Sequence, residues 1–83
     1  MPMIYALINA KARDIEDIME KIYTIPHIAE VNIVTGTYDL VVELKGDDLE
    51  ELLGGVTKRI QSIPGINRID TLICMREAAP IWL

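Results

Sequence analysis

One short stretch, VTGTYDL over residues 34–40, combines residue types that could bind a small molecule. It lies between two apolar, β-branched runs, so Gly36 is expected to form the turn of a hairpin. Tyr38 is a bulky aromatic residue in a chain without Phe, and Asp39 is a carboxylate at the start of a strand, where β-propensity disfavours it. Asp39 could accept hydrogen bonds from the ammonium group of a ligand or from backbone amides of the turn. The residues leave both alternatives open.

The other chemically reactive residues do not form a recognisable catalytic or metal-binding pattern. His27 is the only His, at an expected helix-to-strand corner, and is interpreted as a surface residue. Cys74 is the only Cys and is interpreted as a small buried hydrophobe of a strand rather than as a reactive thiol. The acidic residues between 47 and 51 are expected at the start of a helix, where they suit the helix dipole. The sequence therefore predicts no catalytic residue, no metal site and no cofactor.

Length and composition restrict the class of protein. A single domain of 83 residues buries only about 60% of its unfolded surface, yet 51% of this chain is hydrophobic. Part of the apolar surface is therefore expected to be covered by other subunits. The net charge of −5 argues against direct contact with nucleic acid. No membrane span or signal peptide is recognisable, which predicts a cytoplasmic protein without membrane contact.

Hydrophobic periodicity predicts the order strand, helix, strand, strand, helix, strand. Strands are expected over residues 3–10, 28–35, 38–44 and 66–75, and helices over residues 14–25 and 46–63. Asp14 is the expected N-cap of the first helix, and Asp47 or Asp48 that of the second. Gly54 and Gly55, inside the second helix, either permit close packing against a neighbour or mark a break.

An internal repeat supports this order of elements. A shift of 38 residues places IPHIAEV, residues 25–31, on IPGINRI, residues 63–69. Two similar βαβ halves predict an α+β domain of the ferredoxin-like βαββαβ type. Right-handed crossovers then place the first and third strands at the centre of a four-stranded antiparallel sheet, with both helices on one face.

Alternation along the strands assigns side chains to the two faces of this sheet. The helix-covered face is expected to hold Ile4, Ala6, Ile8, Leu40, Val42 and Leu44. The open face is expected to hold the apolar Tyr5, Leu7, Val34, Val41, Leu72 and Cys74 beside the polar Asn32, Asp39, Glu43, Arg68 and Asp70. Burying these six apolar side chains against another subunit would contribute on the order of 10 kcal/mol to the free energy of association, before the entropic cost of association is subtracted. A dimer in which two open faces pack together is therefore expected.

The stretches IPHIAEVNIVTGTYDLVVEL and IPGINRIDTLI resemble the C-terminal effector domain, or RAM domain, of the Lrp/AsnC family of amino-acid-responsive regulators. The resemblance predicts this domain over residues 1–76 and a C-terminal tail over residues 77–83. It implies face-to-face dimers (dimeric α+β barrels), rings of dimers, and an amino-acid effector bound where dimers meet. Carried over residue by residue, it implies a ligand-binding site formed by Gly36, Tyr38, Asp39 and Thr71. Asp39 would bind the α-ammonium group, and Thr71 the α-carboxylate.

Two functions remain as hypotheses. Members of the family usually carry a helix-turn-helix domain, which is not recognisable here, so the chain resembles a stand-alone effector domain. The first hypothesis is a non-enzymatic amino-acid sensor that oligomerises and modulates transcription or amino-acid metabolism through a partner, such as a full-length Lrp/AsnC regulator. The alternative is a small dimeric α+β barrel enzyme of the monooxygenase or isomerase type, because one fold can host unrelated functions.

At the C-terminus, Ile81, Trp82 and Leu83 either anchor on a neighbouring subunit or end the chain as a frayed terminus.

Overall fold

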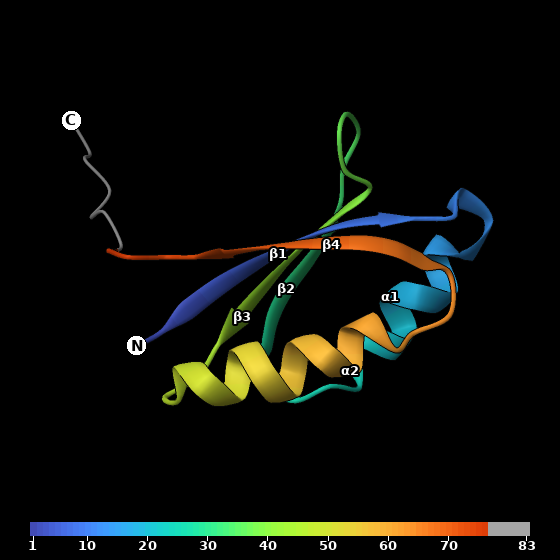
Figure 1. Cartoon of the computed structure of the whole chain (residues 1–83). Coiled ribbons are helices and arrows are strands. Elements are labelled where there is room, and N and C mark those ends of the chain that lie inside the picture. Colours follow the sequence, from blue (N-terminus) through green and yellow to red (C-terminus); the bar gives the residue numbers. More distant parts are fainter. Residues whose placement is uncertain (77–83) are drawn as a thin grey trace.

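The computed structural model describes residues 1–76, which form a four-stranded sheet with two helices on one side (Figure 1). The strands are β1 (Met3–Ala10), β2 (Ile28–Ile33), β3 (Leu40–Lys45) and β4 (Ile66–Ile73). The helical elements are the short 3₁₀ turn η1 (Ala12–Asp14), helix α1 (Ile15–Tyr23), the π-helical segment η2 (Glu51–Val56) and helix α2 (Thr57–Gln61). The antiparallel sheet has the order β2-β3-β1-β4, so the first and third strands are central. The predicted ferredoxin-like βαββαβ fold is confirmed.

The core lies between the sheet and the helices. Side chains from both central strands are fully buried there, namely Ile4, Ala6, Ile8, Leu40, Val42 and Leu44. The helical elements contribute Ile18, Ile22, Leu52, Val56 and Ile60 to the same cluster. The alternation pattern predicted this covered face correctly because successive side chains of a strand point to opposite faces. Each large apolar side chain that is buried here stabilises the fold by about 1.5–3 kcal/mol.

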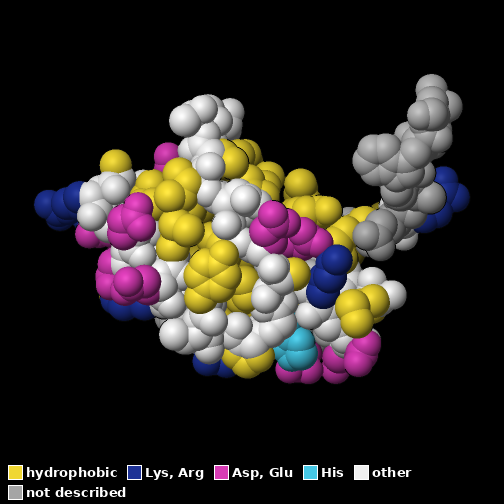
Figure 2. Space-filling view, turned by 180° about the vertical axis from the view of Figure 1, so that it is seen from behind, with side chains coloured by type: hydrophobic (Ala, Val, Ile, Leu, Met, Phe, Trp, Pro, Cys, Tyr) yellow, Lys and Arg dark blue, Asp and Glu magenta, His cyan; other side chains and the backbone are white. Residues whose placement is uncertain are grey.

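Within residues 1–76, no helix covers the opposite face of the sheet (Figure 1). Across the central strands, Leu7 of β1 lies opposite Val41 of β3 and Asp70 of β4, and Tyr5 lies opposite Leu72. Directly opposed residues of antiparallel strands share a face, so these side chains form the open surface that the alternation predicts. Leu72 is 51% exposed. On the side of the molecule that Figure 2 shows, apolar side chains lie among acidic groups.

The second helix is less regular than its sequence predicts. Helical structure begins near residue 49, and Oδ1 of Asp48 accepts hydrogen bonds from the N–H groups of Glu50 (3.0 Å) and Glu51 (3.4 Å), as expected of an N-cap. The uniform helix expected over residues 46–63 is wrong in its middle, where η2 makes a wider π-helical turn that includes both glycines. A π-helical turn takes an extra residue and rotates the apolar stripe, which is consistent with Leu53 being 36% exposed. Thr57 Oγ1 donates to the carbonyl of Leu52 (2.9 Å) in this region.

A tight corner follows each helix at the same position of the repeat. His27 and Gly65, which are 38 residues apart, both have positive φ angles, +73° and +97° respectively. The exposed His27 bonds Oε1 of Glu51 through Nε2 at 3.0 Å, in agreement with its expected place at the surface. Asp14 occupies the predicted N-cap position without making a side-chain cap bond, and its carboxylate lies beside Gly65 instead. The corner at Gly65 is therefore closely packed.

The end of β4 differs in one respect from the sequence-based expectation. Cys74 follows the last residue of β4 and is half-buried, because the open face next to it is uncovered. The single chain thus places Cys74 one residue beyond the strand and half-buried, whereas the sequence predicts a buried residue within the strand. Within residues 1–76, no helix combines the length and the apolar character that a membrane span requires. The predicted anchor at Ile81, Trp82 and Leu83 lies outside the described residues.

Candidate functional site

The loop between β2 and β3, residues 34–39, is attached to the end of β1. The N–H of Asp39 donates to the carbonyl of Ile8 (2.9 Å), and the side-chain amide of Asn9 donates to the carbonyl of Thr37 (2.7 Å). The loop stands on the side of the sheet away from the helices (Figure 1). Gly36 has a φ of +115°, which favours glycine, and apart from its chain neighbours no atom of residues 1–76 lies within 4 Å of the position a Cβ would take. The loop is therefore anchored at its base and open around Gly36.

Asp39 is held in place by the backbone of β1. Its Oδ2 accepts a hydrogen bond from the N–H of Ala10 at 2.9 Å. Its Oδ1 accepts no hydrogen bond from any residue in the range 1–76. An ionised carboxylate has about four acceptor sites. The expected bond to a backbone amide of the turn is replaced by one to the N–H of Ala10 on β1, and the second oxygen of Asp39 is left for a ligand.

Tyr38 crosses the open face and connects the loop to β4. Its hydroxyl donates to Oδ2 of Asp70 at 2.7 Å, and Nε of Arg68 lies 3.2 Å from both oxygens of the same carboxylate. The hydrogen bond to Asp70 raises the pKa of Tyr38 above its usual value. The same bond, with a further contribution from Arg68, lowers the pKa of Asp70 below its usual value. The Tyr38 ring is therefore fixed in a defined position beside the loop.

Thr71 lies apart from the other three predicted ligand-binding residues. It pairs with Ala6 across β1 and β4, so it belongs to the helix-covered face, whereas its neighbour Asp70 belongs to the open face. Asp39 precedes β3, on the other side of β1. Thr71 is half-buried, and its hydroxyl makes no hydrogen bond in the described part of the chain. Within one chain the fold brings Gly36, Tyr38 and Asp39 together but does not bring Thr71 to them.

Three further polar residues belong to this cluster and were not among the predicted site residues, namely Asn9, Arg68 and Asp70. The alternation of side chains along the last strand predicts that Arg68 and Asp70 lie on the open face, and no other feature of the sequence indicates that they belong to the site. Their contact with Tyr38 depends on the cross-strand register, which no short stretch of sequence specifies. Among residues 1–76, no group of three or more His, Cys, Asp or Glu side chains could hold a metal ion. The cluster offers charged and polar groups suited to binding a small polar molecule.

Comparison with known proteins identifies the family. The sequence model described as "Lrp/AsnC ligand binding domain" matches residues 4–80. Among curated proteins, the chain is 31% identical over 74 residues to the HTH-type transcriptional regulator FL11 of Pyrococcus horikoshii, a match that covers 89% of this chain and 48% of the regulator. FL11 of Pyrococcus furiosus matches to the same extent. The chain thus spans about half the length of the curated relatives it matches.

Solved structures agree with this assignment. TTHA0845 from Thermus thermophilus is 36% identical, with a TM-score of 0.86, over 96% of this chain and 100% of that chain. AsnC of Escherichia coli has the same fold, with a TM-score of 0.84 at 19% identity, over 99% of this chain and 56% of that chain. The curated relatives are named transcriptional regulators and the matched model describes a ligand-binding domain, so the comparisons support a regulatory rather than an enzymatic role. The chain therefore belongs to the Lrp/AsnC family, as one of its ligand-binding domains.

Proposed function

We propose that this domain senses a small amino acid at the loop formed by residues 34–39. The observation that carries the proposal is the open Oδ1 of Asp39, whose other oxygen is fixed by the N–H of Ala10 at 2.9 Å. An α-ammonium group bound at Oδ1 would form a charge-assisted hydrogen bond, which is about twice as strong as a neutral one. The free space around Gly36 leaves room for the ligand backbone, and Tyr38 forms one wall of the site.

Thr71 enters this site from a neighbouring subunit. Its hydroxyl is unpaired among residues 1–76 and lies on the edge strand β4, where another subunit can approach. In a ring of dimers, the loop of one dimer meets β4 of the next, and Thr71 donates to the α-carboxylate of the ligand. The amino acid then binds only the assembled ring. It therefore stabilises the ring by mass action, and ligand concentration controls assembly.

The response reaches transcription or amino-acid metabolism through a partner protein. The net charge of −5 disfavours DNA contact by this domain itself. A full-length Lrp/AsnC regulator is the partner of choice, because its effector domain has the same fold and can pair with this domain through the open sheet face. Co-expression with a tagged full-length regulator tests this step. Recovery of mixed oligomers supports it, and strict self-assembly of each protein contradicts it.

The decisive prediction for the site concerns the variant Asp39→Asn. The asparagine oxygen can still accept the N–H of Ala10, whereas the negative charge that binds the ammonium group is lost. We expect amino-acid binding to weaken by about 1.5–3 kcal/mol, with the fold retained. Calorimetry measures this change, using the ligand that a screen of the common amino acids identifies for the unmodified protein.

Asp47→Asn is the matched control for this measurement. It makes the same change of charge at an exposed position near the second helix, close to the opposite end of β1 from Ala10. It should leave the affinity unchanged. If Asp39→Asn folds and binds as tightly as the unmodified protein, Asp39 serves only to hold β1.

A further inference from the structure

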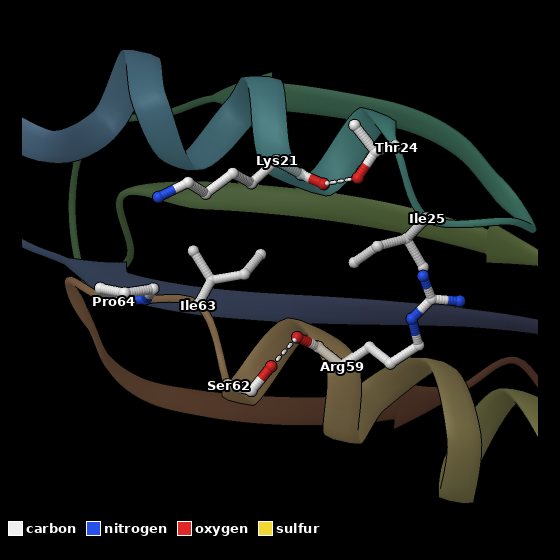
Figure 3. A pocket seen from close by; sticks show the side chains of 7 residues that line it. All are labelled: Lys21, Thr24, Ile25, Arg59, Ser62, Ile63 and Pro64. Carbon is white, nitrogen blue, oxygen red and sulfur yellow. Dashed lines mark hydrogen bonds between the residues drawn. The ribbon is translucent and has the colours of Figure 1, made fainter.

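A cavity of about 300 Å³ lies between the C-terminal ends of α1 and α2, on the helix side of the molecule (Figure 3). Its lining consists of Lys21, Thr24, Ile25, Arg59, Ser62, Ile63 and Pro64. None of these residues belongs to the loop at 34–39 or to the cluster around Tyr38. The volume is at the lower end of the range for small-molecule sites, so a ligand would have to be small.

The internal repeat pairs the residues of this cavity. The shift of 38 residues places Lys21 on Arg59, Thr24 on Ser62, and Ile25 on Ile63. The local geometry also repeats, because each hydroxyl donates to the carbonyl three residues earlier at 2.7 Å. Ile25 and Ile63 are only 7% and 8% exposed and form an apolar floor. Both walls thus offer the same three groups, namely a cation, a hydroxyl oxygen and an apolar surface.

The two cations differ in what they already bind. Lys21 Nζ forms an ion pair with Asp17 at 2.9 Å, one turn earlier on α1. The Arg59 guanidinium makes no hydrogen bond or ion pair within residues 1–76 and extends across the cavity toward Ile25 (Figure 3). A cation near a helix C-terminus is favoured by the helix dipole, which accounts for the charge at both positions. The dipole does not provide a partner for the N–H donors of Arg59.

We infer that this cavity binds a small organic carboxylate with an apolar body. Arg59 would bind the carboxylate through two parallel N–H groups, the geometry that a guanidinium matches best. The apolar body would lie on Ile25 and Ile63, which face the cavity from the two halves of the repeat. The hydroxyl groups of Thr24 and Ser62 already donate to backbone carbonyls, so their oxygens act as acceptors for any donor on the ligand. This site is separate from the amino-acid site and does not depend on it.

The test uses 4-methylpentanoate as the carboxylate probe and 4-methylpentanamide as its neutral counterpart. Methyl-labelled isoleucine reports binding directly by NMR, because Ile25 and Ile63 line the cavity. We expect their signals to shift with the carboxylate, and the amide to bind at least about tenfold more weakly. Arg59→Gln should lose about tenfold or more in affinity. Lys58→Gln is the control, because it removes an adjacent exposed cation that does not line the cavity.

Several outcomes would overturn the inference. Equal losses in Arg59→Gln and Lys58→Gln would show a general effect of charge, and equal binding of acid and amide would show apolar contact alone. The absence of shifts at Ile25 and Ile63 would show that the cavity does not take this class of ligand. Shifts at Ile33, which directly precedes the loop at 34–39, without shifts at Ile25 and Ile63 would place the probe at the loop instead and would contradict the second site.

Discussion

At the scale of single residues, the bond between Tyr38 and Asp70 makes a small part of the stability of the fold dependent on pH. The lowered pKa of Asp70 stabilises the fold above the ordinary Asp pKa, and this contribution is lost as the pH falls through the folded-state value. The raised pKa of Tyr38 stabilises the fold below the ordinary Tyr pKa, and this contribution is lost as the pH rises through the folded-state value. The bond therefore contributes fully between about pH 4 and pH 10.

Replacing the acceptor of this bond tests its effect on Tyr38. In Asp70→Asn the charged acceptor is absent, so we expect the pKa of Tyr38 to fall toward its ordinary value. Ultraviolet titration of the phenol groups measures this change. Asp47→Asn should titrate like the unmodified protein. A titration of Asp70→Asn that superimposes on that of the unmodified protein would mean that the bond is not formed in solution.

Gly65 provides a second test at this scale. A Cβ at this position would lie 2.9 Å from Oδ2 of Asp14 and 3.1 Å from Ile18, on a backbone with a φ of +97°. We expect Gly65→Ala to lower the free energy of unfolding by about 2 kcal/mol or more, since the backbone conformation alone costs about 1–2 kcal/mol. His27→Ala, at the equivalent corner, should cost less, because that residue already has a Cβ. Equal losses in urea unfolding would refute this account.

At the scale of elements, the open question is why the second helix contains two adjacent glycines. Neither has a positive φ. Among residues 1–76, apart from the backbone of the helix itself, a Cβ would meet nothing within 4 Å at Gly54 and only Glu51 Cγ at 4.0 Å at Gly55. Glycine costs about 1 kcal/mol relative to alanine inside a helix. If η2 contacts no other subunit, the double variant Gly54→Ala/Gly55→Ala should gain about 1–2 kcal/mol in urea unfolding. Lower stability, together with a smaller mass in solution, would instead identify the glycines as a contact between subunits.

At the scale of the whole molecule, the open sheet face predicts at least a dimer. Val41 lies near the middle of this face, opposite Leu7. A Lys at this position would bury an unpaired charge in the interface, which costs several kcal/mol. We therefore expect Val41→Lys to dissociate the protein or prevent its folding, as light scattering and circular dichroism would show.

Ile33→Lys is the control for this prediction. Ile33 is also an exposed apolar strand residue, but it pairs with Leu40 and therefore belongs to the other face of the sheet. The control should remain dimeric. A folded, monomeric unmodified protein at micromolar concentration would contradict the predicted dimer, and so would a dimeric Val41→Lys variant.

Much of the fold could be predicted because its signals are local. Apolar residues alternate along β1 and β3 and follow a helical spacing along α1, and the repeat shows that the two halves are alike. These patterns are sufficient to assign the buried face, because the direction of each side chain follows from its own backbone. The π-helical turn at Glu51–Val56 could not be predicted in this way, since the two glycines are compatible with several helical geometries.

The candidate site was predictable only in its local part. Gly36, Tyr38 and Asp39 are close in sequence, so a hairpin necessarily keeps them together. Tyr38 and Asp70 are 32 residues apart, and their bond exists because β1 pairs with β3 on one side and with β4 on the other. Thr71 faces the opposite side of the sheet from Asp70 because successive side chains of a strand alternate. Register is fixed by the packing of all four strands against the helices, so only the tertiary structure decides which distant side chains meet.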